Sequence, residues 1–286
     1  MCSTDINQIL KLNGIAHEYA SVVKHPDVCK TAITSYHIAC AVNPIYNLVV
    51  MEQNNRVILW DFEGTLVDRP GRWRSALMEV LDLNEPDHQV EMEQIRPYLR
   101  DGFPWHHPDE PHTHLRNSQE WWSHVGRIFT RAYQGSGFSF ERAEELASLV
   151  RNTFINPDRF ILYEDTIPAL SNLAEKGWKH VILSNHVPEL SSIVEGVGLS
   201  PYIDYCISSG STGYEKPNPK VFQYALELVR HPEYVWMVGD NSDADIRGAE
   251  SVGIPAILVR GQKDDSVTYY ASDLLEAAKI IEPALT

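Results

Sequence analysis

The stretch that decides the fold is Trp60-Asp61-Phe62-Glu63-Gly64-Thr65-Leu66-Val67-Asp68, which follows the apolar run Val57-Ile58-Leu59. Three apolar residues followed abruptly by acid, glycine and threonine predict a buried strand that ends in a tight loop. Asp61 and Glu63 then lie side by side at the carboxyl end of the strand, where open α/β sheets bind their ligands. One carboxylate can attack as a nucleophile while its neighbour transfers a proton. The stretch therefore predicts a site for group transfer, provided that other segments supply an anion clamp and a metal site.

The composition bounds the class of protein. The chain has 286 residues, of which 43% are hydrophobic, and this suits one large domain or one domain with a sizeable insertion. A net charge of −15 argues against nucleic acid or an anionic membrane as the main partner. Four cysteines without a C-x-x-C pair, no apolar run of transmembrane length and no signal-peptide pattern predict a cytoplasmic protein with reduced thiols. No pattern specifies an oligomeric state.

From Val57 onward, short apolar runs alternate with amphipathic segments. This alternation predicts a parallel sheet with helices on both faces. The predicted strands are Val57–Asp61, His180–Ser184, Tyr205–Ser208, Tyr234–Gly239 and Ala256–Val259. The predicted helices between them include Ile167–Lys176, Leu190–Gly196 and Lys220–Arg230.

Residues 69–162 break this rhythm, because they contain helical patterns and no convincing strand. The patterns cover Trp73–Leu83, Gln119–Tyr133 and Phe140–Phe154. We expect a helical cap over residues 69–162, inserted into an α/β core made of residues 56–68 and 163–286. Residues 1–55 are expected to be an N-terminal extension of unknown role, with the functional domain starting near Met51 as one hypothesis.

Two features of the predicted cap invite a functional interpretation, and a structural one is favoured for both. The histidines at positions 106, 107, 112 and 114 lie in a proline-rich segment without the spacing of a zinc site, so an exposed loop is expected. Trp121 and Trp122, with Ile128 and Phe129 at near-helical spacing, are expected to form the core of the cap.

Three further clusters of polar residues follow predicted strands or open helices. Ser184-Asn185-His186 follows one strand, and Gly213-Tyr214-Glu215-Lys216-Pro217 places a lysine among turn residues before a helix. The acidic loop Gly239-Asp240-Asn241-Ser242-Asp243-Ala244-Asp245 follows another strand. Parallel strands end at the same edge of a sheet, so the strand-end clusters are expected to converge there.

In this order, the four clusters resemble the four motifs of the haloacid dehalogenase-like hydrolase superfamily. Asp61 to Leu66 resembles the first motif, Ser184 the second, Lys216 the third, and Asp240 with Asp245 the fourth. The resemblance covers roughly residues 57–260. It implies a Rossmann-like α/β core with an inserted cap, and hydrolysis of a small phosphorylated metabolite.

Residue types give this chemistry a physical basis. A phosphomonoester is an anion that repels a carboxylate nucleophile, so Lys216 and a divalent cation are expected to neutralise it. Mg²⁺ suits hard carboxylate oxygens, and the resemblance implies Asp61, Asp240 and the backbone carbonyl of Glu63 as its ligands. Asp61 is expected to form an aspartyl-phosphate, and Glu63 to act as the acid and base.

The remaining residues of the motifs receive binding and supporting roles. Ser184 and Asn185 are expected to bind the phosphoryl oxygens together with Lys216. Asp245 is expected to orient Lys216 or metal-bound water, with Asp243 a weaker candidate for that role. Thr65 is expected to support the first loop. His186 is next to Ser184 and could contact substrate, although loop packing is favoured.

Glu63 is a departure, because phosphatases of this superfamily usually have Asp there. The additional methylene displaces the carboxyl by about 1.5 Å, a misplacement that can alter the rate. Two alternatives stay open. One is a haloacid-type dehalogenase, which the acidic Glu63 and the Asp240/Asp245 pair disfavour. The other is a catalytically weak binding or regulatory protein, which the intact nucleophile, lysine and metal acids disfavour.

Overall fold

The computed structural model describes residues 56–115, 117–262 and 265–281. All of them belong to a unit that the contacts delimit as Met51–Thr286. The extension predicted over residues 1–55 lies outside the described residues, so its role and the hypothesis of a start near Met51 stay predictions.

A six-stranded sheet in the order β5-β4-β1-β6-β7-β8 organises the core, and every neighbouring pair in it is parallel. The strands are β1 (Arg56–Trp60), β4 (Lys179–Ser184), β5 (Tyr205–Ser208), β6 (Tyr234–Gly239), β7 (Ala256–Val259) and β8 (Tyr269–Ala271). The five predicted strands are confirmed to within one residue at each end. The edge strand β8 was not predicted, because its three residues form no apolar run of strand length.

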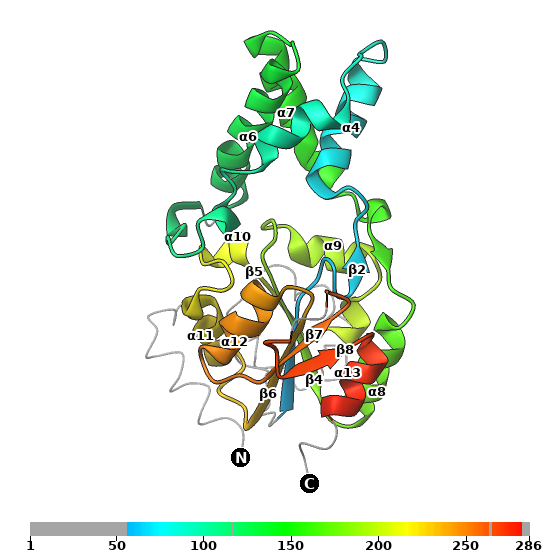
Figure 1. The fold of residues 1–286 in the computed structure, drawn as a ribbon, viewed down its shortest axis with the longest axis vertical. Coiled ribbons are helices and arrows are strands. Elements are labelled where there is room, and N and C mark those ends of the chain that lie inside the picture. Colours follow the sequence, from blue (N-terminus) through cyan, green and yellow to red (C-terminus); the bar gives the residue numbers. More distant parts are fainter. Residues whose placement is uncertain (1–55, 116, 263–264, 282–286) are drawn as a thin grey trace, which may run out of the picture. The chain divides into compact units, whose positions relative to one another are not determined.

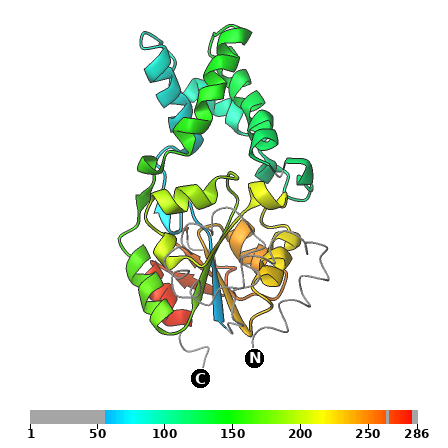
Figure 2. The same cartoon turned by 180° about the vertical axis from the view of Figure 1, so that it is seen from behind.

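Helices cover both faces of the sheet, as predicted (Figures 1 and 2). Ile58 and Trp60 of β1 point into one apolar cluster, and Val57 and Leu59 point into the other, as the two-residue period of a strand requires. The first cluster includes residues of α8 (Thr166–Glu175), α9 (Leu190–Gly196) and α13 (Leu274–Ile281). The second includes residues of α11 (Pro219–Leu228) and α12 (Gly248–Glu250).

A helical segment, here called the helical insertion (residues 72–154), interrupts the core after the first strand. Its helices are α4 (Arg72–Asn84), α5 (Met92–Ile95), α6 (Ser118–Gly135) and α7 (Phe140–Phe154). Both views show the three long helices gathered beyond one end of the sheet (Figures 1 and 2). The chain leaves the core through β2 (Val67–Asp68) and returns through β3 (Ile161–Leu162), which pair antiparallel.

β3 corrects one expectation, because no strand was expected within residues 69–162. A two-residue strand is too short to show the alternation by which sequence reveals strands. The three long helices predicted here are confirmed. Trp121, Ile128 and Phe129 are buried, as expected for the core of this segment. The boundaries of the cap as a separate domain stay a prediction.

The segment with the four histidines is mostly irregular, with short 3₁₀ turns at Pro104–His106 and Thr113–Leu115. His107 and His114 are exposed, as expected for a loop. Among the described helices, none combines the length and apolar character that crossing a membrane requires.

One histidine of the core is held in its neutral form. His180 of β4 is fully buried and accepts a hydrogen bond at Nδ1 from Trp60 Nε1, at 3.0 Å. Its Nε2 lies 3.0 Å from the carbonyl oxygen of Leu170, so the proton of the neutral ring lies on Nε2. Burial lowers the pKa of His180 from 6.5 to about 4, against the opposing effect of Asp204.

We therefore expect His180 to make an unfavourable contribution to stability that grows as the pH falls from 6.5 to 4. In this window the unfolded chain binds a proton at this position that the folded chain excludes, so the free energy of unfolding falls as the pH falls. The shift at His180 corresponds to a loss on the order of 3 kcal/mol across the window. About 2 kcal/mol of this loss falls between pH 7 and pH 5, and urea denaturation of wild type and of a His180 variant at these two pH values isolates it.

A His180→Leu variant should be less stable than wild type at pH 7, by about 1–3 kcal/mol, because the buried Trp60 Nε1 loses its partner. Its stability should also depend less on pH than that of wild type. The exposed His114→Leu change is the control and should leave the pH dependence unaltered. Identical pH slopes for His180→Leu and wild type would contradict this assignment.

Candidate active site

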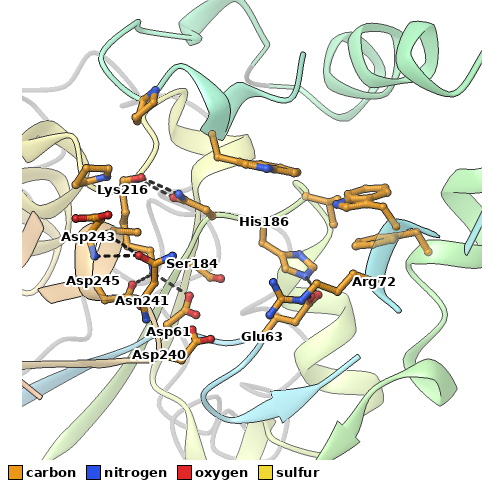
Figure 3. Close-up of a pocket in the computed structure, with 18 residues that line it drawn as sticks. Asp61, Glu63, Arg72, Ser184, His186, Lys216, Asp240, Asn241, Asp243 and Asp245 are labelled. Atoms are coloured by element: carbon orange, nitrogen blue, oxygen red, sulfur yellow. Dashed lines mark hydrogen bonds and ion pairs between the residues drawn. The ribbon is translucent and has the colours of Figure 1, made fainter. Parts of the chain in front are cut away.

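Three neighbouring strands bring the predicted site residues to one edge of the sheet. β1 lies between β4 and β6, with Trp60 opposite Ile182 on one side and Val238 on the other. Asp61 directly follows β1, Ser184 ends β4 and Asp240 directly follows β6. Figure 3 shows these side chains around one cavity.

The loop after β1 is built around Gly64. The N–H of Asp61 donates to the carbonyl of Val238 at 2.9 Å, and the N–H of Gly64 donates to the carbonyl of Val67 at 2.7 Å, so the chain turns at once. Gly64 has a φ of +100°, and a Cβ at this position would lie 2.3 Å from Asp240 Oδ2. Glycine is therefore required both for the backbone conformation and for the close approach of the two acidic loops.

Lys216 is the positive charge of the site. Its side chain is 2% exposed, and Nζ donates to Asp61 Oδ1 at 2.8 Å and to Asp245 Oδ1 at 2.5 Å. Burial alone would lower the pKa of Lys216, but the two carboxylates reverse this and raise it above its usual value. The ammonium group is therefore charged at neutral pH and fixed beside Asp61.

Asn185 positions this lysine. Its side-chain Oδ1 accepts from the N–H of Lys216 at 2.7 Å, and its Nδ2 donates to the carbonyl of Lys216 at 2.8 Å. This pairing was not anticipated, because it joins residues 31 positions apart. Because both polar atoms of the Asn185 side chain already bind Lys216, only its backbone N–H is left to bind a phosphoryl oxygen. This phosphate contact stays a prediction. Ser184 is buried and lines the cavity, and its predicted phosphate contact also stays a prediction.

Three acidic side chains share one small volume. Oxygen atoms of Asp61, Asp240 and Asp245 all lie within 4.8 Å of one another, which makes this the single cluster of potential metal ligands among the residues the structure describes. Burial, with the charge of Asp61 as a further cause, raises the pKa of both Asp240 and Asp245 above the ordinary range. One lysine opposes three carboxylates, so the set has the hard oxygen donors and the surplus negative charge that suit a divalent cation.

Asp245 and Asp243 were the two candidates for orienting Lys216, and they have different contacts in the structure. Asp245 is buried, contacts Nζ through Oδ1 and accepts from the N–H of Asn241 through Oδ2, at 3.0 Å. Asp243 is exposed and pairs with Arg247. Both lie in or beside the π-helical turn Ser242–Arg247, which follows β6.

Thr65 belongs to the loop after β1 but does not line the cavity. It is fully buried, and its carbonyl accepts from Arg260 Nε at 3.0 Å. Arg260 also pairs with Asp165, so it links the first loop to the start of α8. This contact is made by the backbone of Thr65, so the supporting role expected of its side chain stays a prediction.

Glu63 faces the helical insertion. Its Oε1 lies 2.9 Å from Arg72 Nε, and its Oε2 lies 3.9 Å from His186 Nε2. Burial raises the pKa of Glu63 to about 7, although Arg72 and Arg69 act in the opposite direction. Figure 3 shows Arg72, Glu63 and His186 together, on the side of the cavity away from Lys216. A carboxyl group with a pKa near neutrality can both give and take a proton.

Sequence reasoning missed Arg72, and it left His186 between two interpretations. Arg72 has a φ of +49° at the start of α4, and a single arginine at a helix start forms no motif. His186 is buried against Phe62 and Phe154, at 5.6 and 5.9 Å between ring centroids, and it also lines the cavity. Burial lowers the pKa of His186 to about 4, so its ring is neutral.

The cavity has a volume of about 500 Å³, within the range of small-molecule sites. Two parts of the chain line it. The core contributes the acidic cluster, Lys216 and the loop from Ser184 to Val187. The helical insertion contributes Arg72, Trp73, Trp105, Pro108 and Phe154.

This chain is similar in sequence to some known proteins and similar in fold to others. The human haloacid dehalogenase-like hydrolase domain-containing protein 3 is 27% identical over 214 residues, which cover 72% of this chain and 82% of that protein. A phosphoserine phosphatase of Thermus thermophilus is 35% identical over 135 residues, 46% of this chain and 53% of that enzyme. In fold, a 2-haloacid dehalogenase from Pseudomonas syringae pv. Tomato DC3000 is similar with a TM-score of 0.59 and 21% identity, over 80% of this chain and 99% of that one.

A model of the haloacid dehalogenase-like hydrolase family matches residues 55–253, which span all four of the polar clusters that surround the cavity. With this match over more than half of its length, the chain belongs to the haloacid dehalogenase-like hydrolases.

Proposed function

We propose that this protein is a magnesium-dependent phosphatase that hydrolyses a small phosphomonoester through an aspartyl-phosphate. The observation that carries the proposal is the contact of Lys216 Nζ with Asp61 Oδ1 beside the cluster of three carboxylates. A fixed ammonium group next to a carboxylate nucleophile reduces the repulsion that an anionic substrate would otherwise meet. Glu63, two positions after Asp61, has a carboxyl group with a pKa of about 7.

In the first step, Asp61 Oδ2 attacks phosphorus, because Oδ1 is held by Lys216. The bond from phosphorus to the leaving oxygen breaks as the bond to Asp61 forms, and Glu63 gives its proton to the leaving alkoxide. Lys216, Ser184 Oγ and the loop amides after β4 bind the phosphoryl oxygens.

In the second step, Glu63 takes a proton from water. The resulting hydroxide attacks phosphorus, the bond between phosphorus and Asp61 breaks, and inorganic phosphate leaves. Glu63 ends the cycle protonated and Asp61 ends it as a free carboxylate, so both residues are ready for another turnover.

The donor set suits Mg²⁺, with the carboxylates of Asp61 and Asp240 and the backbone carbonyl of Glu63 as its ligands. When bound, the ion supplies positive charge that offsets the charge of the phosphoryl group. Asp245 acts beside it by orienting Lys216.

The helical insertion is proposed to close over the substrate as a lid. Glu189, at the start of α9, accepts from three side chains of the insertion: Ser118 Oγ at 2.5 Å, Trp122 Nε1 at 3.0 Å and Arg151 Nη2 at 2.7 Å. The short ribbon of β2 and β3 connects the insertion to the core and would allow it to move. Closure would exclude water from the cavity before the first step.

A haloacid-type dehalogenase is the second candidate, since a dehalogenase shares the fold. The surplus of negative charge at Asp240 and Asp245 favours the phosphatase, because attack on carbon needs no metal-binding acids. The third candidate is a catalytically weak binding or regulatory protein. The fixed pair of Lys216 and Asp61 does not support this candidate, because it is the pair that catalysis would need. The cytoplasmic location inferred from composition belongs to the proposal as well.

The first test is a panel of phosphorylated metabolites assayed with Mg²⁺ and with EDTA, next to 2-haloacids. We expect turnover of at least one phosphomonoester with Mg²⁺, and a fall of about 10⁴-fold or more in Asp61→Asn, which removes the nucleophile. Asp158→Asn, an exposed change outside the cavity, should keep wild-type turnover. Turnover of 2-haloacids that survives EDTA, or wild-type rates in Asp61→Asn, would refute the phosphatase.

The second test is thermal unfolding with and without Mg²⁺. A ligand at 100 times its Kd stabilises the folded state by about 2.7 kcal/mol, and 1 kcal/mol shifts Tm by about 2–4 °C for a protein of this size. We expect Mg²⁺ to raise the Tm of wild type by several degrees and that of Asp240→Asn by much less. Without metal, Asp240→Asn should melt no lower than wild type, because it relieves repulsion from Asp61. Equal Mg²⁺ shifts in the two proteins would contradict the ligand assignment.

The third test concerns the length of Glu63. Glu63→Gln removes the proton donor and should lower kcat by about 10²–10⁴-fold. Glu63→Asp keeps a carboxyl but withdraws it by about 1.5 Å, so an intermediate loss is expected. The exposed change Glu195→Gln on α9 is the matched control. A wild-type kcat in Glu63→Gln would remove this residue from the mechanism.

A further inference from the structure

The wall of the cavity that the helical insertion supplies is aromatic. Trp73, Trp105 and Phe154 line it, and the two tryptophans are only partly buried. Trp73 stacks on Phe154 with 3.6 Å between centroids and lies 6.2 Å from Trp105 at an interplanar angle of 23°. Trp105 in turn stacks on Phe103 at 4.6 Å, so the wall is backed by further rings.

The position of Glu63 indicates in which direction the leaving group of the substrate extends within the cavity. In the proposed reaction the phosphoryl group lies against Asp61 and Lys216, and the leaving oxygen lies at Glu63, which protonates it. Glu63 contacts Arg72 at 2.9 Å, and Trp73 is the next residue along α4. Whatever is attached to the leaving oxygen therefore extends toward the aromatic wall.

Apart from Arg72, the helical insertion lines this side of the cavity with uncharged side chains. Among the described lining residues, the cationic side chains are Lys216 and Arg72, and both are paired with carboxylates, Lys216 with Asp61 and Asp245 and Arg72 with Glu63. The other side chains that the insertion contributes, Trp73, Trp105, Pro108 and Phe154, are uncharged, so this wall suits an apolar ring.

We propose that the leaving group of the substrate is an alcohol that carries a planar aromatic ring, which stacks against Trp105 and Trp73. The inference rests on the proposed phosphatase function and names its substrate class. A ring in this position gains the offset or tilted contacts that aromatic pairs favour. Two chemical sources fit, an arylalkyl phosphate and a nucleoside 5′-monophosphate.

The test compares substrates that differ in the ring and share a primary alcohol as leaving group. Benzyl phosphate is paired with butyl phosphate, and a nucleoside 5′-monophosphate with ribose 5-phosphate. An aromatic contact favours the ring-bearing member of a pair by about three- to tenfold in kcat/KM. A preference confined to the nucleotide pair identifies a nucleobase as the ring, and one confined to the benzyl pair identifies a ring close to the phosphate. Phosphoserine, whose leaving group has no ring, should be turned over less well than benzyl phosphate.

Variants of the aromatic wall test whether it causes the preference for substrates with a ring. Trp105→Leu should abolish most of it, and Trp105→Phe should keep it. Trp121→Leu is the matched control, because Trp121 lies 6.2 Å from Trp105 in the same cluster, is buried and does not line the cavity. The readout is the ratio of kcat/KM within a pair, which a smaller folded fraction leaves unchanged.

The inference and the proposed function fail in different ways. If no phosphomonoester in the set is hydrolysed in a manner that depends on Asp61, the phosphatase itself is wrong. If hydrolysis occurs but neither pair shows a preference for the ring, the substrate class is wrong and the phosphatase stands. A preference that survives intact in Trp105→Leu also overturns the role of the wall, whatever Trp121→Leu shows. The comparison of wild-type rates decides the substrate class even if a variant does not fold.

Discussion

The ammonium group of Lys216 between Asp61 and Asp245 is the interaction on which the rest of the site depends. All three side chains are buried, where an unpaired charge is costly, so each requires the others. The contact also joins segments far apart in the chain, since Lys216 and Asp61 are separated by 155 positions. Asn185 holds the backbone of Lys216 on both sides, so the lysine is fixed at its main chain as well as at its tip.

Glu63 connects this buried centre to the helical insertion. The longer side chain was a reason to expect altered efficiency, and the structure shows where its carboxylate lies. It contacts Arg72 at the first residue of α4. The acid that is proposed to protonate the leaving group is therefore held by the same segment that supplies the aromatic wall. Proton transfer and recognition of the leaving group would both depend on the insertion lying over the cavity.

The sequence predicted most of the core because buried parallel strands are apolar on both faces and end abruptly in polar loops. β1, β4 and β6 are recognised in this way, and their ends place Asp61, Ser184 and Asp240 at one edge. The strands β2, β3 and β8 were missed, since two or three residues cannot show a period. Arg72 was missed for a related reason, because one exposed arginine at a helix start has no pattern around it.

By itself, the sequence determined the order of the elements, the identity of the reactive groups and the family to which the chain belongs. These features are local, or they recur in a fixed order along the chain. The tertiary structure alone decided which side chains meet. Asp245 contacts Lys216, while Asp243, two residues earlier, pairs with Arg247, because the π-helical turn buries one and exposes the other. Asn185 meets the backbone of Lys216 because β4 and β5 pair side by side, a packing that no spacing in the sequence encodes.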